Sequence, residues 1–238
     1  MGILCFGSLN MDHVYQVSHI ARPGETIHSH GYAKHLGGKG LNQSVALARA
    51  GARVCHAGCI GPDGEGTRDW LLQNGVDTRF VRRVDVPSGQ AIIQVDRAGN
   101  NCIVLFSGAN ACLDRGWIDE VYGAQAAGDW VLLQNEVNEL AYLIESAHRR
   151  GLRIALNPSP ISDGLRAAPL DLVDLFLLTE IEGEALSGQT VPARMIDALR
   201  TRYPGAAFVL TLGEKGAMYA DKNARLQVDA VPVEAVDT

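Results

Sequence analysis

The chain has 238 residues, of which 47% are hydrophobic and 20% are charged, and its formal net charge is −6. This length and composition predict a folded protein with a sizeable core and exclude extended disorder. The acidic balance argues against a nucleic-acid or anionic-membrane partner, because either needs a basic surface. No apolar run approaches the roughly 20 residues of a membrane span. The five cysteines, an odd number, predict reduced thiols and a cytoplasmic protein.

Apolar segments alternate with helical patterns along most of the chain. Runs that predict buried strands lie at 3–6, 54–60, 128–134, 152–156, 172–178 and 207–212. Helical patterns lie at 41–50, 66–74, 138–150, 180–187 and 193–202. Strands that are apolar on both faces and alternate with helices predict an α/β fold, with a mainly parallel central sheet and helices on both faces.

Two segments lack this alternation, residues 12–36 and residues 79–107. In the second, the apolar runs 92–95 and 102–105 flank Ala98-Gly99-Asn100, a pattern that is typical of a hairpin. We therefore expect a small antiparallel β lid beside the main sheet, built from approximately 12–36 and 79–107. The chain contains no interdomain linker, which predicts one domain over residues 1–238.

Polar side chains follow the carboxyl ends of five predicted strands. They are Asn10 and Asp12, then Gln134, Asn135 and Glu136, then Asn157, then Thr179 and Glu182, and last the segment 213–216. Ligands of open parallel sheets bind outside these ends. Any single loop is polar simply because loops are exposed, but five such loops together favour a binding site.

Asn10 and Asp12 are two residues apart, so in an extended segment both project from the same face. An amide beside a carboxylate both donates to and accepts from neighbouring hydroxyls, which suits a sugar or another polyol. The same two residue types also stabilise turns, and this alternative stays open on the sequence alone.

The segment Gly37-Gly38-Lys39-Gly40 runs directly into the helical pattern at 41–50. Glycines let backbone N–H groups approach a ligand, and a helix start supplies positive potential. The segment lacks the five-residue lead and the Lys-Ser/Thr ending of a Walker A loop. Asn42, one turn into the helix, faces the same opening. The pattern leaves open whether the bound group is a phosphate or a hydroxyl.

Together these residues resemble the ribokinase-type carbohydrate kinases, and the ribokinase branch in particular. The segment Gly37–Ser44, with Gly51 and Gly61 after it, is similar to the first signature of that family. Further segments that fit the family are Pro23–Thr26, Gly108–Asn110, Asn157-Pro158 and Thr211–Gly216. The resemblance implies a ribokinase-like fold whose β lid joins two copies in a homodimer.

The resemblance also implies an activity, in which ATP with Mg²⁺ phosphorylates a primary hydroxyl of a sugar, with ribose as the expected sugar. The sugar-binding residues that it implies are Asn10, Asp12, Gly38, Lys39, Asn42 and Glu136. The nucleotide-binding residues that it implies are Thr179, Thr211, Gly213 and Gly216. Glu182 would bind Mg²⁺ through water, and Asp237 would belong to a site for a monovalent cation such as K⁺.

Two departures from the family pattern bear on this expectation. The family has an asparagine where this chain has Thr179, whose shorter side chain reaches less far toward phosphate. The family's second signature, which supplies an anion hole and the base aspartate, begins at Asp237-Thr238, where the sequence ends. We therefore expect the catalytic base to lie beyond Thr238 and this chain alone to have little kinase activity. A non-catalytic sugar-binding protein and a kinase for a nucleoside or another sugar remain alternatives.

Overall fold

The computed structural model describes residues 2–232 and divides into two compact units. Unit 1 comprises Met1–Gln125 with Glu136–Glu139, and unit 2 comprises Ala126–Asn135 with Leu140–Thr238. The single domain expected from the sequence stays a prediction. Asp237, expected at a K⁺ site, lies outside the described residues. None of the helices within residues 2–232 is long and apolar enough to cross a membrane.

Unit 1 contains three parallel strands in the order β1 (Ile3–Phe6), β4 (Val54–Ile60) and β5 (Asp77–Arg83). Its helices are α1 (Lys39–Arg49), α2 (Glu65–Gln73) and α3 (Arg115–Gly123), and η1 (Gly108–Ala111) is a short 3₁₀ turn. Phe6 packs edge-on against Trp117 and Tyr122, with ring centroids 5.3 and 5.8 Å apart. These aromatic contacts bury β1 beneath α3.

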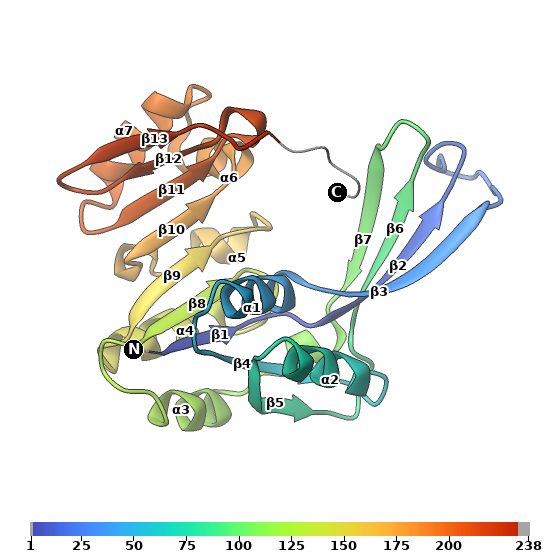
Figure 1. Cartoon of the computed structure of the whole chain (residues 1–238), viewed down its shortest axis with the longest axis horizontal. Coiled ribbons are helices and arrows are strands. Elements are labelled where there is room, and N and C mark those ends of the chain that lie inside the picture. The colour runs from blue at the N-terminus through green and yellow to red at the C-terminus, as the bar shows by residue number, and fades with distance from the viewer. Residues whose placement is uncertain (1, 233–238) are drawn as a thin grey trace. The chain divides into compact units, whose positions relative to one another are not determined.

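The second sheet of unit 1, which we call the lid sheet, has the order β3 (Gly31–Gly37), β2 (Asn10–Gln16), β6 (Gly89–Val95) and β7 (Asn101–Phe106) (Figure 1). The predicted hairpin is confirmed, because β6 and β7 pair antiparallel. The pair β2–β3 is also antiparallel, whereas β2 and β6 run parallel. In this register Asn10 lies opposite both Gly37 and Gly89.

The expected extent of the lid needs one correction. The prediction assigned all of 79–107 to the lid, but β5 pairs in parallel with β4 in the other sheet of unit 1. β5 is an edge strand of that sheet, and its exposed residues include Arg79 and Arg83. Because an edge strand needs solvated side chains, its sequence resembles that of a strand in an exposed lid.

Up to residue 232, unit 2 contains six strands in the order β8 (Trp130–Gln134), β9 (Arg153–Asn157), β10 (Leu175–Leu178), β11 (Ala207–Thr211), β12 (Ala217–Ala220) and β13 (Arg225–Val228). The first four are parallel, and β12 and β13 add antiparallel pairs. The helices are α4 (Leu140–Arg149), α5 (Asp163–Arg166), α6 (Glu180–Ser187) and α7 (Pro192–Arg202), with 3₁₀ turns η2 (Leu170–Leu172) and η3 (Gly213–Lys215). Phe176 stacks on Phe208 in its core. The predicted α/β architecture with a mainly parallel sheet is confirmed, while β12 and β13 were not predicted.

Candidate active site

The first turn of α1 packs against the segment that joins β1 to β2. A Cβ atom at Gly38 would lie 2.9 Å from the Ser8 carbonyl oxygen, and one at Gly40 would lie 2.5 Å from the Ser8 nitrogen. Gly38 also has a φ of 96°, a conformation that favours glycine. The predicted glycine-rich segment therefore lets the helix backbone contact the strand end directly, next to Asn10.

Glu136 occupies the amino-terminal end of α1. Its Oε2 accepts hydrogen bonds from the Lys39 backbone N–H, at 3.0 Å, and from the Ser8 hydroxyl. Its Oε1 lies 2.6 Å from Lys39 Nζ, and the Glu136 side chain is only 8% exposed. A carboxylate here interacts favourably with the positive end of the helix dipole.

The other N–H groups of this first turn are also paired. Gly40 N–H donates to Ser8 Oγ at 3.2 Å, and Leu41 N–H donates to the Ser8 carbonyl at 3.0 Å. Asn42 N–H makes the first helical hydrogen bond, to the Gly38 carbonyl. A phosphate would need free N–H groups at this helix end, so the structure argues against a phosphate here and favours a neutral ligand.

Asp12 carries a buried carboxylate oxygen, Oδ1, that has no hydrogen-bond partner among the described residues. A Cβ atom at Gly37 would collide with the same carboxylate, so only glycine leaves room for it. Burial raises the pKa of Asp12, and the negative charge of Glu136 raises it further, while His35 and Lys39 act in the opposite direction. An unpaired buried carboxylate is costly, and a hydroxyl donor from a ligand would satisfy it.

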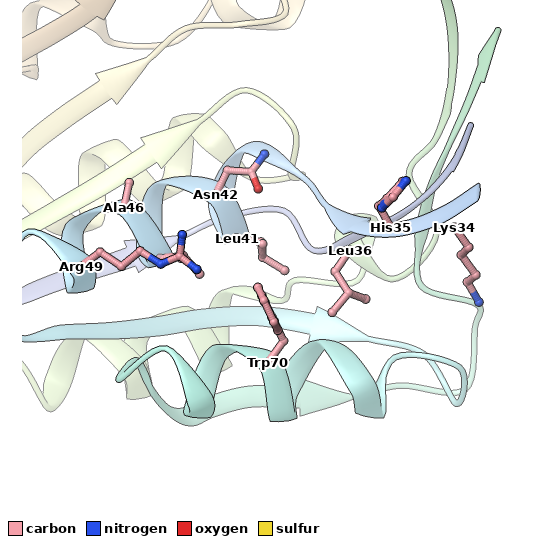
Figure 2. Close-up of a pocket in the computed structure, with 9 residues that line it drawn as sticks. Lys34, His35, Leu36, Leu41, Asn42, Ala46, Arg49 and Trp70 are labelled. Carbon is pink, nitrogen blue, oxygen red and sulfur yellow. The ribbon is translucent and has the colours of Figure 1, made fainter. Parts of the chain in front are cut away.

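A cavity of about 490 Å³ lies beside this site (Figure 2). Its lining comes from β3, α1 and α2 and consists of Lys34, His35, Leu36, Leu41, Asn42, Val45, Ala46, Arg49 and Trp70. Figure 2 shows Trp70 pointing from α2 toward Leu41 on α1. Among the predicted site residues, Asn42 belongs to this lining, while Asn10 and Asp12 do not.

The predicted nucleotide residues come together at one edge of the unit 2 sheet. β10 and β11 are adjacent, with Leu178 opposite Leu210, so Thr179 and Thr211 lie where neighbouring parallel strands end. The Thr211 hydroxyl donates to the Leu178 carbonyl at 3.2 Å. Gly213 and Gly216, with φ of 56° and 84°, form the tight turn that follows β11.

Glu182 and Thr179 form a capping box at the start of α6. Glu182 Oε2 accepts from the Thr179 N–H at 2.8 Å and also from the Thr179 hydroxyl. Burial by itself raises the pKa of Glu182, but hydrogen bonds from Thr179 and Ser159 outweigh it and leave the pKa below its usual value. The carboxylate is therefore ionised at neutral pH. Within residues 2–232 no cluster of three His, Cys, Asp or Glu residues could hold a metal ion.

The family of the chain follows from a comparison with known sequences, because the pattern of the pfkB family carbohydrate kinases matches residues 2–238. This chain belongs to the pfkB family of carbohydrate kinases. The ribokinase of Haemophilus influenzae is 34% identical over 244 residues, which cover 98% of this chain and 78% of that protein. The predicted family is thus confirmed.

Solved structures agree with this pfkB assignment. The ribokinase of Thermotoga maritima has a TM-score of 0.83 and 30% identity, covering all of this chain and 80% of that one. The ribokinase of Cryptococcus neoformans, solved in complex with ADP, has a TM-score of 0.80 and 30% identity, covering 98% of this chain and 80% of that one. The predicted ribokinase-like fold is confirmed by these matches.

Two residues of this pfkB kinase have roles in the site that sequence reasoning missed. Ser8 links Glu136 to Gly40, and Asn110 bonds to the Asn10 side chain at 2.7 Å. Asn110 stands in the segment Gly108–Asn110, which fits the family pattern, and this was its only signal. The capping box was missed as well, although Thr179 and Glu182 have its Thr-x-x-Glu spacing.

Proposed function

We propose that this pfkB-family kinase binds ribose in unit 1 and ATP in unit 2, and that it phosphorylates a primary hydroxyl of the sugar. The sugar would be held by Asn10, Asp12, Gly38, Lys39, Asn42 and Glu136. The observation that carries the proposal is the buried, unpartnered Oδ1 of Asp12 beside a helix start whose N–H groups are already paired. A neutral polyol supplies the missing O–H donor, whereas a phosphate would add negative charge beside Asp12 and Glu136.

The side chains around Asp12 offer complementary groups for a polyol. An ionised carboxylate is an acceptor only, so Asp12 takes a hydroxyl proton. Lys39 has three N–H donors on its side chain, and among residues 2–232 its ion-pair partner is Glu136, so donors remain for sugar oxygens. Relatives that are named ribokinases make ribose the first sugar to test.

For the nucleotide, we assign Thr179, Thr211, Gly213 and Gly216 at the ends of β10 and β11. The ADP complex of the Cryptococcus neoformans ribokinase supports a nucleotide in this fold. Glu182, ionised and capping α6, would hold Mg²⁺ through water, and the ion would neutralise charge on the phosphates. A K⁺ site at Asp237 remains part of the proposal.

We further assign the lid sheet to a homodimer interface. Four consecutive apolar residues of its edge strand β7 are about half exposed: Ile103 at 50%, Val104 at 61%, Leu105 at 49% and Phe106 at 55%. Apolar exposure of this kind on a monomer marks an interaction surface. A second copy of the chain would cover it.

Calorimetry with ribose, followed by 2-deoxyribose, fructose and adenosine, tests the sugar assignment. Binding is measured rather than turnover, so the result does not depend on a catalytic base. We expect ribose to bind, and Asp12→Asn to weaken binding at least about tenfold. Asp85→Asn, an exposed carboxylate in the same unit, serves as the matched control. If adenosine binds and ribose does not, adenosine replaces ribose as the proposed phosphoryl acceptor. If none of these compounds binds, the proposal is refuted.

ATP titrations with and without Mg²⁺ test the nucleotide assignment. We expect Mg²⁺ to tighten ATP binding to the wild type and to do so less in Glu182→Gln. Glutamine also completes a capping box, so α6 should keep its start. The control is Glu184→Gln, an exposed position on the same helix. An equal effect of Mg²⁺ in all three proteins would remove Glu182 from the ion site.

A further inference from the structure

One backbone group fixes the orientation of two buried side-chain amides. The Leu9 N–H lies 3.0 Å from the side-chain oxygen of Asn110, and a backbone N–H can only donate. The other end of the Asn110 amide must then be its NH₂ group, which lies 2.7 Å from Asn10. Since an NH₂ group needs an acceptor, Asn10 must present Oδ1 to it. The ambiguity between O and N that affects most amides is thereby removed.

The consequence concerns the free end of Asn10. With its Oδ1 taken by Asn110, Asn10 keeps its NH₂ group, which bonds to no acceptor among residues 2–232. The next residue on the same face of β2 is Asp12, which accepts only. The site therefore offers a donor and an acceptor side by side.

We propose that Asn110 is a positioning residue that holds Asn10 as a hydrogen-bond donor toward the substrate. This inference rests on the proposed sugar site. In that site, the Asn10 NH₂ group donates a hydrogen bond to an oxygen of the sugar, and Asp12 accepts one from a sugar hydroxyl. The arrangement discriminates against an analogue with a protonated amine at the position that meets Asn10, because such a group donates and cannot accept.

The packing around the two amides supports this role. Asn10 and Asn110 are both buried, at 7% and 2% exposure. Gly89 on β6 lies opposite Asn10 on β2. A Cβ atom at position 89 would collide with Asn110 Nδ2 and Asn10 Oδ1. Position 89 must therefore be glycine for the contact between the two amides to form.

Asn110 is itself held by a separate set of contacts. It belongs to η1, and its carbonyl accepts from the Asn138 N–H at 3.3 Å. The Asn138 side chain accepts from the Leu113 N–H at 3.0 Å and donates to the Leu113 carbonyl at 2.9 Å. The segment that carries Asn110 is thus fixed without help from Asn10, which lets Asn110 impose an orientation on it.

The first test reads the amide orientation in the ligand-free protein, by NMR of the ¹⁵N side-chain amides. Asn10→Asp and Asn110→Asp assign the two signals. In the wild type we expect slow hydrogen exchange for the Asn110 NH₂ and fast exchange for the Asn10 NH₂. In Asn110→Asp, at a pH where the new carboxylate is ionised, the Asn10 amide turns toward it and its exchange slows at least about tenfold. Slow exchange of the Asn10 NH₂ in the wild type, or no change in the variant, would overturn the proposal.

The second test measures ribose affinity. We expect Asn110→Asp, which keeps the acceptor for Leu9, to weaken binding at least about tenfold. The matched control is Asn138→Asp, which removes an amide donor to the Leu113 carbonyl and so loosens the support of the Asn110 segment without touching Asn10. It should weaken ribose binding clearly less than Asn110→Asp does. Equal losses in both variants would mean that Asn110 only supports packing, and no loss in either would mean that Asn110 does not act through Asn10.

Failure of the sugar site and failure of this inference give different results. A wild type that binds no sugar refutes the proposed function, while the NMR experiment still decides the amide orientation. If Asn110→Asp does not fold, Gly89→Ala disturbs the same amide pair from β6. It should weaken ribose binding to a similar extent, and unchanged affinity in a folded Gly89→Ala would contradict the proposal.

Discussion

Lys39 donates to Glu136 from two places, its backbone N–H at 3.0 Å and its side-chain Nζ at 2.6 Å. The pair therefore closes the start of α1 with a carboxylate of the protein itself. This relationship distinguishes the helix end from a phosphate-binding one, because its positive potential is already balanced. It also joins the segment Glu136–Glu139 to α1 within unit 1.

The first prediction concerns the stability contributed by this contact. Glu136→Gln removes a charge that pairs with Lys39 and accepts from Ser8, in a side chain that is 8% exposed. We expect the free energy of unfolding, measured with urea, to fall by roughly 1.5–3 kcal/mol. The control is Glu139→Gln, which ends a more exposed pair with Arg115 and should cost less than about 1 kcal/mol. Equal losses would show that Glu136 contributes no more than a surface ion pair.

The second prediction is a pH dependence that comes from Asp12. Burial and Glu136 raise its pKa above the ordinary 3.8. Ribose hydroxyls that donate to the carboxylate favour its charged form, so binding releases a proton at low pH. Ribose affinity should therefore fall as the pH drops through the raised pKa, by up to about tenfold per pH unit. Calorimetry between about pH 7 and about pH 4.5 measures this fall, and Asp12→Asn should remove it.

The same raised pKa predicts the sign of a stability effect. Because the folded state holds the Asp12 proton more tightly than the unfolded state, ionisation destabilises the fold as the pH rises through the folded pKa. Asp12→Asn should therefore be at least as stable as the wild type near neutral pH, and this advantage should vanish in acid. A variant that is less stable at neutral pH would show that the carboxylate has a stabilising partner.

What the sequence could predict depends on how far apart the interacting residues are. The start of α1 was predictable, because Gly38 and Gly40 precede an apolar helical pattern directly. The hydrogen bonds from Asn110 to Asn10 and from Ser8 to Glu136 span 100 and 128 positions, and no local sequence pattern indicates such pairs. Residue types at strand ends predicted that Thr179 and Thr211 would lie at the same edge of the unit 2 sheet, but not that Glu136 would pair with Lys39.

The third prediction concerns His56, which is fully buried in β4 with Nδ1 2.8 Å from Ser44 Oγ. Burial lowers its pKa from 6.5 to about 4. As the pH falls between these values, the unfolded chain binds a proton that the folded protein does not, so the free energy of unfolding decreases. We measure the free energy of unfolding with urea at about pH 7.5 and about pH 4.5. The decrease between these two pH values should be smaller in His56→Gln than in the wild type, by up to about 3 kcal/mol.

A matched variant separates this titration from the packing of the histidine. Ser44→Ala removes the hydrogen bond to His56 but keeps the titrating ring, so its stability should fall with pH about as steeply as that of the wild type. The carboxyl groups of the chain titrate in the same way in all three proteins, so their effect on stability is shared. If His56→Gln lost stability with the same slope, the histidine would not be the source of the acid sensitivity.

The fourth prediction tests the lid sheet as a dimer interface. Val104 is 61% exposed near the middle of β7, and its cross-strand neighbour Ile92 is 46% exposed on β6. If a second copy covers this apolar surface, Val104→Glu buries an unpaired charge and should convert a dimer to a monomer in sedimentation velocity at micromolar concentration. Leu72→Glu, on α2 outside the lid and exposed to 52%, controls for the loss of an apolar side chain in general. A wild type that sediments as a monomer at all concentrations, or a control that dissociates as readily as Val104→Glu, would rule out the lid as the interface. A variant that is monomeric and still binds ribose would show in addition that the sugar site of unit 1 forms without a partner copy.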